Sequence, residues 1–135
     1  EKETAVQKAQ NMIDDFELAE VAKSKAKTLS GGWQRRLSIA MALISDPEIL
    51  FLDEPTLGLD VLARRELWNK ISALKGKITV ILTTHYLEEA ESLSDRIGIM
   101  VKGNRVAEGT ADELKNSVNA TSFEDAFVKI AEEGK

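Results

Sequence analysis

The stretch Ile49-Leu50-Phe51-Leu52-Asp53-Glu54-Pro55 decides the fold, because four apolar residues in a row end in two carboxylates and a proline. A short run that is apolar throughout is typical of a strand buried on both faces, as in a parallel sheet. The run Ile78 to Leu82 is also apolar, except at Thr79, and Thr83, Thr84 and the single histidine, His85, follow it. Two such runs separated by a helical segment predict an α/β fold built on a parallel sheet.

Helical segments surround these two strands. The pattern before them predicts a helix from Thr4 to about Val21 and a second helix that begins after Ser30 and ends at Asp46-Pro47. After them the expected elements are a helix capped by Asp60 and ending near Gly76, a helix from Leu87 to Leu93, a hairpin of Ile97–Val101 with Arg105–Ala107, a helix with the capping box Thr110 and Glu113, and a last helix capped by Ser122.

Composition narrows the class of protein. The 135 residues are 43% hydrophobic and 30% charged, which fits a soluble globular domain. The formal net charge of −5 argues against a general nucleic-acid surface, which would be basic. The absence of cysteine excludes disulfides and thiolate metal sites, and no apolar run approaches the roughly 20 residues of a membrane span.

Polar residues gather where the predicted strands end. The carboxyl ends of parallel strands form the binding edge of such a sheet, so Asp53, Glu54 and His85 are expected at one edge. A carboxylate pair can hold a divalent cation and activate a water molecule. The tetrapeptide Leu29-Ser30-Gly31-Gly32 places a hydroxyl and two glycines at a helix start, which favours anion binding. Taken singly, an ordinary capped helix, a solvated turn and a structural histidine remain alternatives.

Four motifs in one order make those alternatives improbable together, and in this order the sequence resembles the ATP-binding-cassette (ABC) ATPase family. Leu29 to Gln34 is similar to its signature motif, and Ile49 to Glu54 to its Walker B strand with the catalytic glutamate. Gly58-Leu59-Asp60 resembles the D-loop, and His85 the switch histidine. The resemblance implies a partial P-loop NTPase (RecA-like) parallel sheet plus part of the ABC helical subdomain.

The resemblance also implies residue roles. In the family two ATPase domains meet head to tail with ATP between them, so Ser30 and Gly32 are expected to contact the γ-phosphate of ATP held by the opposite subunit. Asp53 is expected to hold Mg²⁺, Glu54 to polarise the attacking water and His85 to steady the γ-phosphate. The implied nucleotide-binding residues are Ser30, Gly31, Gly32, Gln34 and Asp60. Trp33 stands where the family commonly has glutamine, and Gln34 follows it.

The phosphate loop G-x-x-x-x-G-K-[ST] does not occur in the 135 residues. We therefore expect the C-terminal part of an ABC ATPase that neither binds nor hydrolyses ATP by itself. The family's phosphate-loop strand lies between the strand ending at His85 and the strand near Ile97–Val101, so two strand edges are expected to face a gap and to pair with another chain or aggregate. The expected division is 1–46 (helical subdomain with the signature), 47–109 (ATPase core) and 110–135 (C-terminal helices).

Three stretches, 29–37, 82–91 and 122–127, are most similar to multidrug-type exporter ATPases. This implies a second ABC ATPase subunit and a membrane-spanning permease as partners, no nucleic acid, and a cytoplasmic location on the inner face of the membrane. A non-transport ABC ATPase of DNA repair, chromosome structure or translation is the alternative. No sustained heptad pattern, which would indicate the coiled coils of the repair and chromosome members, occurs from Glu1 to Lys27.

Overall fold

The computed structural model describes residues 2–134. Contacts along the chain group these residues into two units, the first ending at Thr83 and the second beginning at Thr84. The expected functional division at residues 46 and 109 stays a prediction.

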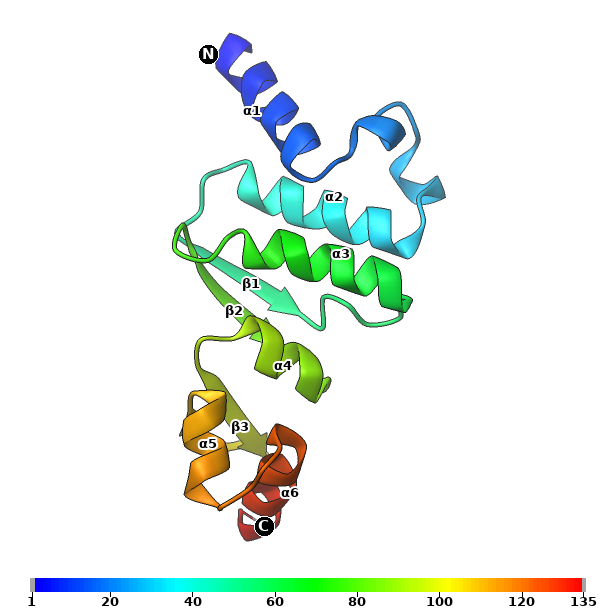
Figure 1. The fold of residues 1–135 in the computed structure, drawn as a ribbon. Coiled ribbons are helices and arrows are strands. Elements are labelled where there is room, and N and C mark those ends of the chain that lie inside the picture. Colours follow the sequence, from blue (N-terminus) through cyan, green and yellow to red (C-terminus); the bar gives the residue numbers. More distant parts are fainter. Residues whose placement is uncertain (1, 135) are drawn as a thin grey trace. The chain divides into compact units, whose positions relative to one another are not determined.

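The first unit carries three helices and a parallel pair of strands (Figure 1). β1 and β2 pair in parallel, with Ile49 opposite Thr79 and Asp53 opposite Thr83. This confirms the parallel strands expected from the two apolar runs. The elements are α1 (Lys2–Asp15), two short 3-10 turns (Ala19–Val21 and Ala26–Thr28), α2 (Gly31–Leu43), β1 (Ile49–Asp53), α3 (Val61–Ser72) and β2 (Thr79–Thr83).

The first helix is shorter than expected. α1 stops at Asp15 because Glu17 takes a positive φ of 54°, which no right-handed helix accommodates. The reversal turns Phe16 and Leu18 into the interior, where both are buried. α1 itself contributes no buried residue. The apolar periodicity up to Val21 therefore continues through a turn rather than through one helix.

The sheet of the first unit is buried on one face, not on both as expected. Leu50 and Leu52 are buried, whereas Ile49, Phe51 and Ile81 on the alternate positions are exposed, Phe51 to 72%. Successive strand residues point to opposite faces, so these exposed side chains share one side of the sheet. The prediction was wrong because an apolar run shows only that both faces of the strand are apolar. It does not show whether another layer of the protein packs on each face.

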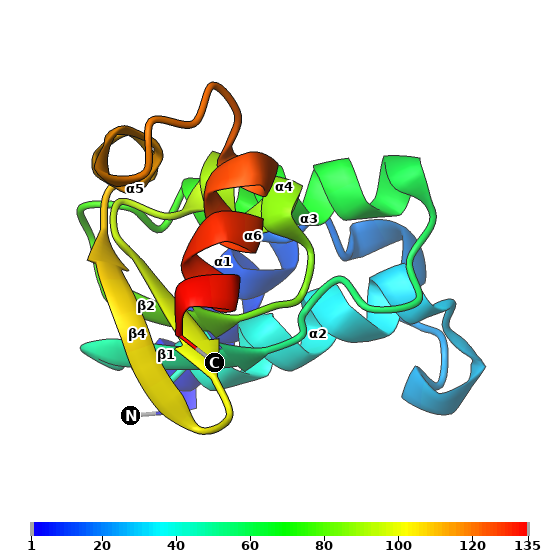
Figure 2. The same cartoon turned by 90° about the horizontal axis from the view of Figure 1, so that it is seen from below.

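The second unit is a hairpin packed against helices (Figure 2). Its core cluster consists of Ile97, Ile99, Leu114, Phe123 and Ile130. The elements are α4 (Leu87–Leu93), β3 (Ile97–Val101), β4 (Asn104–Gly109), α5 (Ala111–Ser117) and α6 (Phe123–Glu133).

Local sequence chemistry explains the turns and caps of the second unit. Lys102 and Gly103 take φ angles of 49° and 81°, so the hairpin turns there, one residue earlier than the pair Gly103-Asn104 suggested. The expected capping box of Thr110 and Glu113 is confirmed, as is the Ser122 cap on α6.

The strands of residues 2–134 form two separate sheets, β1 with β2 and β3 with β4. The parallel part is thus a single pair within this chain. Such a mixed helix and strand arrangement with a parallel pair agrees with the expected partial P-loop NTPase fold. Within the described residues, no helix is long and apolar enough to cross a membrane.

Candidate functional site

The carboxyl end of β1 holds the carboxylate pair. Asp53 is the last strand residue, and its Oδ1 accepts a hydrogen bond from the Thr83 hydroxyl of the neighbouring strand. The backbone N–H of Glu54 donates to the Thr83 carbonyl at 2.9 Å. Asp53 is exposed and Glu54 half-buried. Two carboxylates therefore leave the sheet at one point, fixed by bonds to the end of β2.

Glu54 also carries a strained backbone. Its φ of 47° lies in the left-handed region, which residues other than glycine rarely adopt. The chain turns sharply after it, and Pro55 and Thr56 are buried directly behind. Strain of this kind persists where the surroundings over-determine a conformation, and it clusters at functional sites. The position of this glutamate is thus set by the fold rather than by local preference.

The glycine-led loop opens α2. Ser30 occupies the cap position with extended backbone angles, but its side chain makes no cap hydrogen bond. The Gln34 side-chain amide instead donates to the carbonyls of Leu29 at 3.1 Å and Ala26 at 3.4 Å. The amides of the first turn of α2 are therefore not capped by the serine, which suits a helix start that receives an anion.

The two glycines bring α2 close to α3. A Cβ on Gly31 would lie 3.4 Å from Leu59 Cδ2, and one on Gly32 would lie 3.3 Å from the Cβ of Ala63. α2 and α3 accordingly lie side by side with their N-termini at the same end (Figure 1). Asp60 caps α3 by accepting from the Ala63 N–H at 2.9 Å. The predicted signature and D-loop residues are thus brought together.

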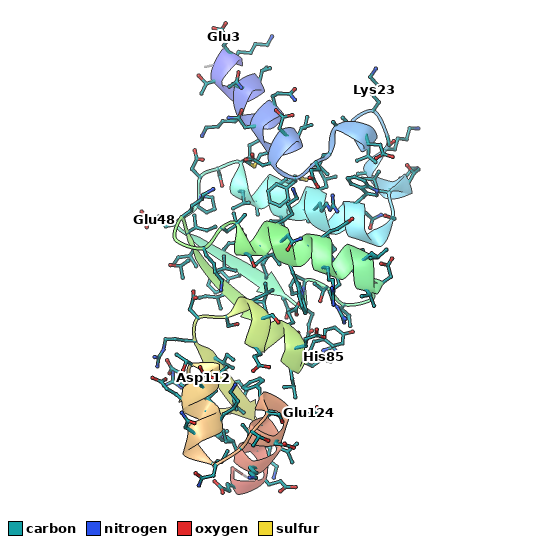
Figure 3. The ribbon with its side chains drawn as sticks, viewed as in Figure 1. Glu3, Lys23, Glu48, His85, Asp112 and Glu124 are labelled. Atoms are coloured by element: carbon teal, nitrogen blue, oxygen red, sulfur yellow. The ribbon has the colours of Figure 1, made fainter. Side chains whose placement is uncertain are left out.

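His85 belongs to the second unit, where it stands just before α4 (Figure 3). Its ring lies 4.3 Å from the ring of Tyr86, centroid to centroid, with the planes tilted by 36°. The Tyr86 N–H donates to the Thr84 hydroxyl at 3.0 Å, which shapes the turn into α4. Glu54 belongs to the first unit, so the expected closeness of the Glu54 carboxylate and the His85 imidazole stays a prediction.

Residues 1–57 match the protein family described as ABC transporter. The chain is 50% identical over 109 residues to the daunorubicin resistance ATP-binding protein DrrA3 of Streptomyces coeruleorubidus, covering 80% of this chain and 34% of that protein. It is 45% identical over 117 residues to the daunorubicin/doxorubicin resistance ATP-binding protein DrrA of Streptomyces peucetius, covering 86% and 36%. A solved ATP-binding subunit of an ABC transporter superposes with a TM-score of 0.79 at 26% identity, covering 96% of this chain and 55% of that one. The chain belongs to the ABC transporter ATP-binding family. It spans about a third of the length of these two relatives.

The described residues of this chain could supply only a small part of the coordination shell of a metal ion. Among residues 2–134, no group of three or more histidine, cysteine, aspartate or glutamate side chains is arranged to hold an ion. Mg²⁺ in nucleotide sites takes one or two carboxylates and completes its shell with phosphate oxygens and water. Asp53, exposed at the end of β1, fits that limited contribution.

Sequence reasoning missed two residues that contact or adjoin the candidate site. Thr83 holds the Asp53 carboxylate, and the strand register alone could have pointed to it because Thr83 lies opposite Asp53. Arg36 is buried behind the signature, with 6% of its surface exposed. Its spacing of three, four and seven residues before Ile39, Ala40 and Leu43 places Arg36 on the buried face of α2, a signal that the exposed Arg35 lacks.

An open cavity of about 620 Å³ lies at the other end of β1. Glu48, which directly precedes that strand (Figure 3), lines it together with Met12, Phe16 and Lys77. Asp53 and Glu54 stand at the opposite strand end, so the cavity is separate from the candidate site, and we assign it no role.

Proposed function

We propose that this chain is part of an ABC-transporter ATP-binding subunit, and that it supplies the signature and catalytic groups to ATP bound between two such subunits. The observation that carries the proposal is the start of α2, where an uncapped, glycine-led helix end lies against the Asp60-capped start of α3. Both features belong to the unit that also presents Asp53 and Glu54. The drug-resistance names of the relatives support a transporter over a non-transport ATPase.

Each residue has a distinct task in this proposal. The Ser30 hydroxyl and the backbone N–H groups of Gly31 and Gly32 donate hydrogen bonds to the γ-phosphate of ATP on the opposite subunit. Helix N-termini stabilise such charge by about 0.3–1 kcal/mol per contact, and by up to about 2 kcal/mol when partly buried. Asp60 keeps the start of α3 ordered beside them and couples the two sites of the dimer.

The carboxylates at the end of β1 act on water and cation. Glu54 accepts a proton from the attacking water. Asp53, whose carboxylate is oriented by the Thr83 hydroxyl, would help to hold the Mg²⁺ ion. Mg²⁺, when bound, neutralises charge on the phosphate oxygens. His85 donates a hydrogen bond to the γ-phosphate. Phosphoryl transfer depends chiefly on such positioning and charge stabilisation.

Gln34 and Trp33 take different parts. We keep Gln34 in the nucleotide-binding set as a residue that acts by holding the loop, since its amide nitrogen donates to the Leu29 and Ala26 carbonyls. The Arg36 guanidinium lies 4.8 Å from the centroid of the Trp33 ring. We therefore assign the Trp33 ring a contact within its own chain and no contact with nucleotide.

The partners follow from the proposed reaction. A second ABC ATPase subunit completes the head-to-tail site, and a membrane-spanning permease converts closure of the dimer into transport. The subunit would then work on the cytoplasmic face of the membrane. The two relatives are named for daunorubicin and doxorubicin resistance, and we propose export of such compounds as the first activity to test.

Glu54→Gln tests the catalytic assignment. The host is a chimera in which this chain replaces the matching part of the Streptomyces peucetius relative. We expect ATP hydrolysis to fall by roughly 10²–10⁴-fold, the range for loss of a positioned base. Glu48→Gln is the matched control, because Glu48 is exposed at the other end of β1. Equal rates for both variants would contradict the proposal.

We further propose that residues 1–135 alone do not bind Mg-ATP. The groups they offer the phosphates are mainly carboxylates and one helix end, a poor environment for several negative charges. Isothermal titration calorimetry of the 135-residue chain checks this, and micromolar binding would refute it.

A further inference from the structure

Arg36 is a buried charge within the first unit. Only 6% of its surface is exposed, although the neighbouring Arg35 of the same helix is exposed. Burying a guanidinium is costly unless the charge is paired and hydrogen-bonded. The surroundings of Arg36 must therefore supply specific partners, and these partners indicate what the residue holds together.

Three groups from three places in the chain meet this guanidinium. Its Nη2 donates to Glu66 Oε2 on α3, and its Nη1 lies 3.5 Å from Glu17 Oε2 in the turn after α1. The guanidinium carbon also lies 4.8 Å from the centroid of the Trp33 ring, a cation–π distance. Glu17 accepts a second cation, Lys70 of α3, at 3.3 Å.

The contacts of Arg36 extend the interface between α2 and α3 that begins at the two glycines. Gly32 lies against Ala63, and one helical turn further along both helices Arg36 pairs with Glu66. Residues three and four apart share a helix face, so the glycine contact and the ion pair fix the same register of α2 on α3. The buried apolar residues of the two helices, among them Ile39 and Leu67, follow.

We propose that Arg36 is a positioning residue for the signature loop. By tying α2 to α3 and to the turn at Glu17, it fixes where Ser30 and the first amides of α2 stand relative to Asp60. It acts without touching nucleotide, and its stack with Trp33 gives the unusual aromatic residue of this signature a role within its own chain. This inference rests on the proposed phosphate contact of Ser30 and Gly32.

The structural half of the test uses the 135-residue chain. Trp68→Phe leaves Trp33 as the single tryptophan, since the chain has two. In that background Arg36→Gln is expected to shift Trp33 emission and to speed amide exchange of residues 31–35 by at least about tenfold, whereas the exposed control Arg35→Gln changes neither. Unchanged exchange and emission in Arg36→Gln would overturn the proposal.

The functional half uses the chimera with the Streptomyces peucetius relative. A displacement of about 1 Å at a positioned group can cost roughly 10²-fold in rate, so Arg36→Gln is expected to lower kcat at least about tenfold. The KM for ATP should stay within about threefold, and Arg36→Lys should recover part of kcat because it keeps the charge. A residue that only stabilises the fold would reduce the amount of folded protein and leave kcat per folded molecule unchanged, which would overturn the inference.

Two further variants keep the test decisive. Should Arg36→Gln fail to fold, Glu66→Gln removes one exposed negative charge while Glu17 still faces the guanidinium, and it is expected to lower kcat in the same direction. Loss of activity in Glu54→Gln with no effect of Arg36→Gln or Glu66→Gln would overturn this inference alone. Full activity in Glu54→Gln would instead overturn the proposed function beneath it.

Discussion

Gly32→Ala separates two reasons for the glycine in the signature loop. One reason is close approach of a phosphate to the backbone, and the other is close packing of α2 on α3. The substitution adds one methyl group in the first turn of α2. That methyl would lie 3.3 Å from the Cβ of Ala63.

The structure sets the size of the stability effect. Carbon atoms pack best at about 3.5–4.0 Å, so the new contact is tight by only a few tenths of an ångström. Overpacking costs about 1–3 kcal/mol, and the low end applies to one methyl contact. Replacing glycine by alanine within a helix gains about 0.8–1 kcal/mol. The two effects nearly cancel, so we expect a change in the free energy of unfolding below about 1 kcal/mol.

Urea unfolding of the 135-residue chain measures that change, and ATP hydrolysis by the chimera measures the function. Hydrolysis should fall steeply in Gly32→Ala, because the methyl group blocks the approach of phosphate oxygens to the backbone amide. Gly31→Ala is the matched control for packing, since its methyl would meet the movable end of Leu59 at 3.4 Å. A loss of more than about 2 kcal/mol in Gly32→Ala alone would refute the reasoning, since packing rather than ligand approach would then require the glycine.

Three further outcomes are expected. Asp60→Ala should lower the free energy of unfolding by about 0.5–2 kcal/mol in urea titrations, because it removes the cap of α3. Ser30→Ala removes no cap hydrogen bond, so it should change the free energy of unfolding by only about a few tenths of a kcal/mol and still slow ATP hydrolysis by the chimera. Phe51→Thr should leave stability within about 0.5 kcal/mol and reduce binding of an apolar dye, whereas Leu52→Ala should cost about 2–5 kcal/mol. The hydrogen bond to Asp112 raises the pKa of Lys115 above its ordinary value of 10.5. The stability lost in Lys115→Gln should therefore be constant below pH 10.5 and vanish as the pH rises through the raised pKa. Equal losses at every pH in urea titrations would contradict this.

Local chemistry explains which parts of the fold were predictable. The Asp60 cap and the Thr110 capping box each depend on a few neighbouring residues, and both stand as expected. The apolar runs likewise predict β1 and β2 because strand length and side-chain type are local properties. The order of the motifs, rather than any one of them, identified the family.

The differences arise where distant groups decide. Glu17 ends α1 through a backbone angle that the apolar periodicity does not report. Burial of β1 on a single face depends on which layers cover the sheet, and the run Ile49 to Leu52 only says that both faces suit apolar surroundings. Arg36 becomes a buried partner of Glu66 solely through the packing of α2 on α3. No spacing in the sequence encodes that contact.

The apolar side chains left on one side of the β1–β2 pair have a consequence inside a cell. Chaperones that hold unfolded chains and proteases that remove them both select such surfaces, and small differences in free energy change abundance several-fold. The steady amount of this polypeptide should therefore depend on how soon after synthesis Phe51 and Ile81 are shielded from solvent. Supply of the surface that shields them would then limit how much of this polypeptide accumulates.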